Sequence, residues 1–178
     1  MKILVSLVFL IISSVINAQT DDLKGLAGYV DFGDLSAVYG EPKVRINIGK
    51  QLLQFVSWAA EGVEDESAEL FNKLDAVRVE VYDLNDNAGP AVDAINNVAK
   101  KLQPDNWEPI VTVNDGEDHV RIYTKLGDNV MNGLVVMVVD AQEAVFINII
   151  GDIDPAQLGK VTNALDIDVN IPAQDGVQ

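Results

Sequence analysis

The chain has 178 residues, a formal net charge of −16 and no cysteine. Without thiols it offers no disulfide framework, no cysteine nucleophile and no thiolate metal ligand. The negative charge opposes phosphate backbones, and the three arginines are too scattered to form a basic stripe. The sequence therefore predicts that neither nucleic acid nor an anionic membrane is a partner.

The N-terminal residues 1–18 have the pattern of a secretory signal peptide. Lys2 is followed by an apolar run over 3–12, interrupted only by Ser6, then by two serines and a small residue, Ala18, before a polar segment. The run is shorter than the roughly 20 apolar residues that a membrane span needs. We expect cleavage after Ala18, a mature chain without a membrane span, and a periplasmic or secreted location.

The first half of the mature chain alternates strands and helices. Residues 43–48 follow a turn and alternate like a strand, and residues 50–61 read as a helix. The helix is expected to bury one face, made of Leu52, Leu53, Val56, Ala59 and Ala60. After an acidic stretch, a short helix is expected over 68–74. Residues 75–84 then alternate as a half-buried strand, followed by a helix over 90–102 with Asn87 as its N-cap.

Four strands in succession are expected next. Residues 107–113 and 117–126 are joined by the turn signal Asn114-Asp115-Gly116, and 134–139 and 144–150 are apolar on both faces. The turn between the middle two strands falls either at 127–129 or at Asn132-Gly133. We favour 127–129, with Asn132-Gly133 as a β-bulge, since this gives longer matched strands.

The chain ends with one more predicted helix and a tail. Asp154 and Pro155 are a typical N-cap and first helical residue, and Leu158, Val161 and Leu165 would form the buried stripe. Residues 19–165 are expected to form a single domain, and 166–178 a flexible tail. The element order predicts an α+β two-layer sandwich: a mainly antiparallel sheet of about five strands, with helices packed on one face.

Three stretches carry a resemblance to a known family. They are residues 28–32, residues 77–82, and the block from 133–136 through 145–154. With the signal peptide, they resemble the bacterial domain of unknown function 4252 family over most of the mature chain. The resemblance implies an exported protein of Gram-negative bacteria, in the periplasm or envelope, with no established activity and no catalytic residues to transfer.

Catalytic and metal-binding patterns are sparse. His119 is the only histidine, and no Gly-x-Ser-x-Gly elbow occurs. We interpret His119 as a surface residue because it lies on an expected exposed strand edge beside a turn. Residues 83–89 place oxygen ligands at alternate positions, as a calcium loop does, but Ala88 and Ala94 replace the glycine and glutamate that such a loop requires. We therefore predict no catalytic residue, no cofactor and no metal site.

The polar faces of two predicted strands form the candidate interaction surface. Tyrosine and arginine are enriched at interface hot spots, and an open sheet face would present them on a rigid platform. The residues are Arg78, Glu80, Tyr82, His119, Arg121 and Tyr123. We expect a non-enzymatic, exported binding or interaction domain, with an unidentified protein as the possible partner. The alternative is a calcium-dependent or carboxylate-based hydrolytic protein.

Overall fold

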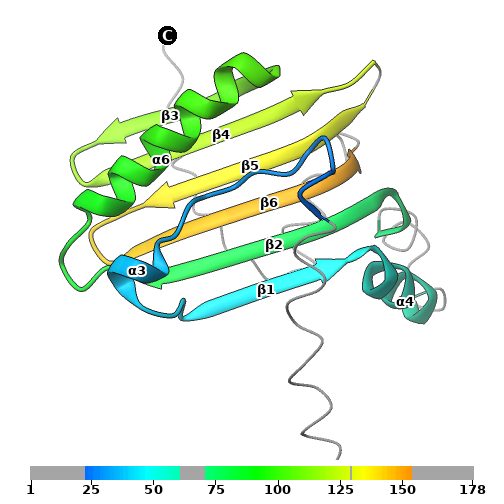
Figure 1. Ribbon diagram of the computed structural model, residues 1–178, viewed down its shortest axis with the longest axis horizontal. Coiled ribbons are helices and arrows are strands. Elements are labelled where there is room, and N and C mark those ends of the chain that lie inside the picture. Colours follow the sequence, from blue (N-terminus) through cyan, green and yellow to red (C-terminus); the bar gives the residue numbers. More distant parts are fainter. Residues whose placement is uncertain (1–22, 61–70, 129, 154–178) are drawn as a thin grey trace, which may run out of the picture.

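A computed structural model describes residues 23–60, 71–128 and 130–153, which form one antiparallel sheet flanked by helices (Figure 1). The predicted signal peptide, the 154–165 helix and the tail lie outside these ranges. The elements, in chain order, are α3 (Ser36–Tyr39), β1 (Val44–Gly49), α4 (Lys50–Ala60), β2 (Leu74–Asp83), α6 (Gly89–Leu102), the 3-10 turn η1 (Gln103–Asp105), β3 (Trp107–Asp115), β4 (Asp118–Leu126), β5 (Met131–Val139) and β6 (Glu143–Ile153).

The sheet has six strands in the order β1-β2-β6-β5-β4-β3, and every neighbouring pair is antiparallel. The expected α+β class is confirmed, with one strand more than the expected count of about five. The β4–β5 turn lies at 127–130, where the Gly127 N–H donates to the Val130 carbonyl (2.8 Å). The register then shifts between Met131 and Gly133, so the favoured turn and the bulge are both confirmed.

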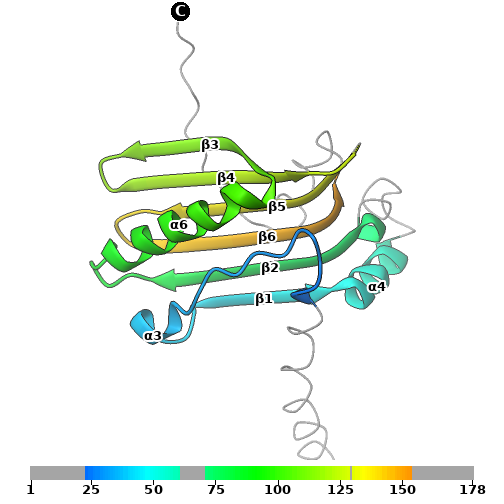
Figure 2. The ribbon, with the colours of Figure 1, turned by 45° about the horizontal axis from the view of Figure 1, so that its top comes forward.

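One face of the sheet is covered by α6 and by the extended segment 28–35, which runs across it (Figure 2). α6 turns one stripe inward, made of Ala91, Ile95, Val98 and Leu102. Phe32 from the crossing segment packs on Phe146 of β6, with ring centroids 5.2 Å apart. Burial of these side chains is the main stabilising contribution on this face.

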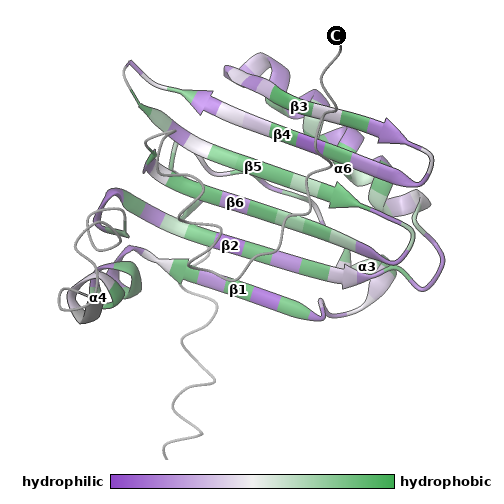
Figure 3. Ribbon diagram, turned by 180° about the vertical axis from the view of Figure 1, so that it is seen from behind, coloured by the Kyte–Doolittle hydropathy of each residue, from purple (hydrophilic) through white to green (hydrophobic). Residues whose placement is uncertain are grey.

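The opposite face, here called the second face, is apolar as well. Side chains from all six strands contribute to it, and Figure 3 shows hydrophobic residues recurring along β5 and β6 in particular. Its buried strand members are Leu74, Val77, Val79, Val120, Ile122, Met131, Leu134, Val136, Ile147, Ile149 and Ile153. Leu53 of α4 also belongs to this face, whereas α6 lies on the other, so the prediction of a two-layer sandwich with helices on one face is not confirmed.

The start of α6 differs from the expectation. Its N-cap is Ala88 and no side chain of the cap residue bonds to the helix, so the prediction of Asn87 as N-cap was wrong. Tyr39, at the end of α3 and remote in the sequence, forms hydrogen bonds at the start of α6 instead. Its hydroxyl accepts from the Ala91 N–H (3.0 Å) and donates to the Asn87 carbonyl (2.7 Å). The first turn of α6 thus gains a partner that only the tertiary fold supplies.

Candidate interaction surface

The six residues predicted to form an exposed polar surface lie on the α6 side of the sheet. Four of them are buried there: Tyr82, Tyr123, Arg78 and Arg121, with exposed fractions of 2%, 6%, 9% and 9%. The expectation of an open, solvated face was therefore wrong. The crossing segment and α6 cover this face, and Arg78, Tyr82 and Arg121 are tolerated there because each has a hydrogen-bond partner.

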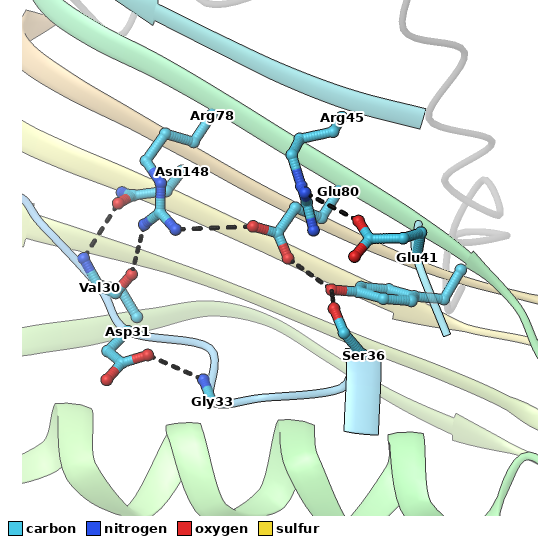
Figure 4. A network of polar contacts seen from close by, with 10 residues as sticks. Val30, Asp31, Gly33, Ser36, Glu41, Arg45, Arg78, Glu80 and Asn148 are labelled. Carbon is cyan, nitrogen blue, oxygen red and sulfur yellow. Dashed lines mark hydrogen bonds and ion pairs between the residues drawn. The ribbon is translucent and has the colours of Figure 1, made fainter. Parts of the chain in front are cut away.

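Arg78 fastens the crossing segment to the sheet (Figure 4). Its Nη1 donates to the Val30 carbonyl (2.8 Å), and its guanidinium lies 4.8 Å from the centre of the Tyr29 ring. Next to it, Asn148 accepts from the Val30 N–H (3.0 Å) and donates to the Gly28 carbonyl (2.9 Å). Every one of these bonds secures the backbone of residues 28–30, which gives the cluster a structural role.

Glu80 and Tyr82 continue this network toward α3. The Tyr82 hydroxyl donates to Glu80 Oε2 (2.8 Å) and lies 3.4 Å from Ser36 Oγ, and Arg78 Nη2 lies 3.7 Å from Glu80 Oε1. Burial is the main cause that raises the pKa of the Tyr82 phenol above its ordinary value. Tyr82 is therefore neutral at physiological pH and serves as a hydrogen-bond donor.

Arg121 is held by uncharged groups. It donates to the Val113 carbonyl (2.8 Å) and to Asn114 Oδ1 (2.7 Å). His119 Nδ1 lies 3.3 Å from the same amide oxygen, so the histidine and the arginine share Asn114 at the β3–β4 hairpin. This arrangement links His119 and Arg121 to the β3–β4 hairpin through one amide oxygen.

The acidic loop after β2 forms a tight turn. Asn85 and Asp86 both adopt positive φ angles, 49° and 61°, and the Asn87 N–H donates to the Leu84 carbonyl (2.9 Å). Asp83 Oδ1 accepts from the Asn85 N–H (3.3 Å). Within the described ranges, no three histidine, aspartate or glutamate side chains come together as a metal site would require.

A different surface, on α4, exposes large apolar side chains. The helix buries Leu53 and Ser57, each only 1% exposed, but turns four large side chains to solvent. These four residues, here called the α4 patch, are Leu52 (51% exposed), Phe55 (60%), Val56 (38%) and Trp58 (67%). The expectation that Leu52 and Val56 would be buried with Leu53 was wrong, because α4 projects beyond the end of the sheet (Figure 1).

The two aromatic residues of the α4 patch contact each other, and the first residue of α4 pairs with β2. The Phe55 and Trp58 rings pack against each other with centroids 5.9 Å apart and a 44° interplanar angle. Lys50, the first residue of α4, pairs with Asp75 of β2 (Nζ–Oδ1 2.7 Å). A hollow of about 310 Å³, lined in part by Leu23, Leu26 and Lys50, adjoins this end of the helix.

The sequence carried a signal for this surface. Apolar residues at 52, 53, 55, 56 and 58 occupy more of the helix circumference than one buried stripe needs. A helix that packs with one face and is apolar over most of its surface leaves apolar side chains exposed. The apolar pattern defines only approximately which side of the helix faces the sheet. Phe55 and Trp58 were therefore missed as candidate surface residues.

These features define an α+β domain with one six-stranded antiparallel sheet and an apolar helix projecting from it. The chain belongs to the family described as Domain of unknown function (DUF4252), whose model matches residues 39–161. The expected family is thereby confirmed. No curated protein and no solved structure matches the chain. Among the described helices, none is both long and apolar enough to cross a membrane.

Proposed function

We propose that the mature protein is an exported, non-enzymatic interaction domain of the bacterial cell envelope that binds a protein partner through the α4 patch. The observation that carries this proposal is the outward placement of Leu52, Phe55, Val56 and Trp58 on one helix. Contiguous apolar side chains on a protein surface mark interaction sites. Tryptophan is also among the residues most enriched at interface hot spots.

The energetic argument favours a bound state for this helix. Burying a large apolar side chain is worth about 1.5–3 kcal/mol relative to leaving it in water. In the free domain, Phe55 and Trp58 lack most of this burial free energy, because the two rings cover each other only in part. A partner that covers both rings recovers it, which makes the pair the expected centre of the interface.

Charge narrows the chemistry of the partner. With a net charge of −16, the chain is repelled by anionic lipid and by a second copy of itself. An apolar pocket rimmed by lysine or arginine on another protein complements both the rings and the surrounding charge. The polar clusters around Arg78 and Arg121 are fully engaged in holding the fold, which supports a binding role over a catalytic one.

Export belongs to the same proposal. The basic start, the short apolar run and Ala18 support cleavage after residue 18 and a periplasmic or secreted destination. N-terminal sequencing of the protein from the periplasmic fraction is expected to begin at Gln19. An intact Met1 on protein recovered from the cytoplasm would contradict the proposal.

The α4 patch is tested by co-purification of tagged protein from the native envelope. We expect a partner to accompany the wild type and to be lost from the double variant Phe55→Ser/Trp58→Ser. Serine has a helix propensity similar to those of phenylalanine and tryptophan, so α4 is preserved.

The matched control replaces two exposed apolar residues elsewhere, Ile110→Ser/Leu126→Ser, which are 54% and 49% exposed. The control is expected to keep the partner. Retention of every co-purifying protein by the α4 variant would overturn the proposal. Binding of the wild type to phosphatidylethanolamine vesicles with a shift in Trp58 fluorescence would replace the protein partner with a membrane.

A further inference from the structure

The second face of the sheet is buried more deeply than the described elements explain. Val136, Ile147 and Ile149, in the middle of this face, are 5%, 1% and 1% exposed. Among the described residues, Leu53 and Phe71 are the only members of this cluster from outside the strands. The main sheet contacts of α4 are with β1 and β2, at one edge, and α6 lies on the opposite face.

We propose that residues 154–165 of the same chain cover the second face as an amphipathic helix. The chain enters this segment on the correct side, because Ile153, at the end of β6, is fully buried and belongs to the second-face cluster. Leu158, Val161 and Leu165 recur at helical spacing behind the start signal Asp154-Pro155. These three apolar side chains are suited to pack on the valines and isoleucines of the sheet.

The dimensions agree with this placement. A 12-residue helix is about 18 Å long. The distance from β6 across β5 and β4 to β3 is three strand spacings, about 14 Å. A helix that begins at the end of β6 therefore reaches across the half of the sheet that α4 leaves uncovered.

Other parts of the chain fit this role less well. Half of the ten residues 61–70 are acidic, which does not suit an apolar face. If residues 1–18 are removed, as in the proposed function, only residues 19–22 precede Leu23. A second copy of the chain meets the repulsion of two strongly negative molecules.

The absence of native cysteine allows a direct test with one spin label. Asn163→Cys places a nitroxide on the polar side of the proposed helix in the chain from residue 19 onward. We expect broadening of the Ile122, Val136 and Ile147 methyl signals and no broadening of Ile95 and Val98 in α6. The matched control, a label at the exposed Asn97→Cys in α6, is expected to give the reverse pattern.

Sharp second-face methyl signals with the label at residue 163 would overturn the proposal. A mixture of spin-labelled protein without isotopes and isotope-enriched protein without label distinguishes a cover from the same chain from a cover by a second copy. Broadening of second-face methyls in that mixture would assign the cover to a second copy, which also overturns the proposal. Neither outcome depends on α4, so the failure of this inference is distinguishable from failure of the proposed function.

Discussion

Asn148 shows how single buried side chains organise this domain. It is fully buried on β6, and its amide bonds to both the N–H of Val30 and the carbonyl of Gly28. An amide can do this because it carries a donor and an acceptor side by side. These hydrogen bonds position the crossing segment on the sheet in addition to the packing of its apolar side chains.

Replacing Asn148 by alanine is expected to destabilise the protein strongly. Each buried backbone group left without a partner costs about 1–3 kcal/mol, and this change strands two of them. Urea unfolding measures the loss. Asn97→Ala on the exposed face of α6 is the control, expected to change stability by no more than about 0.5 kcal/mol. Equal stabilities of the two variants would contradict the conclusion that Asn148 holds residues 28–30 on the sheet.

Gly28 is expected to tolerate no side chain. A Cβ atom there would lie 2.2 Å from the Asn132 carbonyl oxygen, which belongs to the backbone and cannot rotate away. Gly28→Ala should cost about 1–3 kcal/mol in the free energy of unfolding, as overpacking typically does. Gly25→Ala, with nothing within 4 Å of the added atom, is the matched control. A Gly28 variant as stable as the Gly25 variant would disprove the close approach.

Tyr82 predicts a pH dependence. Burial raises the pKa of its phenol above the ordinary value of 10.0. Above about pH 10 the unfolded chain loses this proton while the folded chain keeps it, so stability falls as pH rises through this range. Tyr82→Phe is expected to make the alkaline decline of the unfolding free energy shallower. Part of the alkaline decline is expected to remain in this variant, because the pKa values of Tyr39, Lys43 and Lys50 are also raised.

At the scale of elements, the strands were the most predictable feature. The alternation in 75–84 anticipated β2 to within one residue at each end, because Val77, Val79 and Val81 point to one side. The same alternation failed to predict burial of Arg78 and Tyr82. Their partners, Val30 and Ser36, come from a segment more than 40 residues away, and no local pattern announces them.

α4 has buried and exposed apolar side chains, and the difference between them is testable by substitution. Leu53→Ala is expected to lower the free energy of unfolding by about 2–5 kcal/mol, as for other buried leucines. Phe55→Ser and Trp58→Ser, two and five residues further along the same helix, are expected to change it by at most about 0.5 kcal/mol. Thermal and urea unfolding compare the three. A large loss for the two exposed positions would mean that they pack within the domain.

At the scale of the whole molecule, the sheet is apolar on both faces. The sequence indicated this for β5 and β6, whose residues are hydrophobic without alternation, but the polar alternation in β2 and β4 argued for one open face. The structure closes that face with α6 and the crossing segment. The outward apolar surface is instead on α4, where helical periodicity alone could not distinguish buried from exposed apolar residues.

The most direct test of the account is site-specific photo-crosslinking in intact cells that express the full chain. A photoreactive amino acid at position 55 or 58 is predicted to give one discrete adduct with an envelope protein, and the same group at position 110 on β3 is predicted to give none. The absence of an adduct from both α4 positions, or the same adducts from position 110, would contradict the claim that the protein acts through the α4 patch.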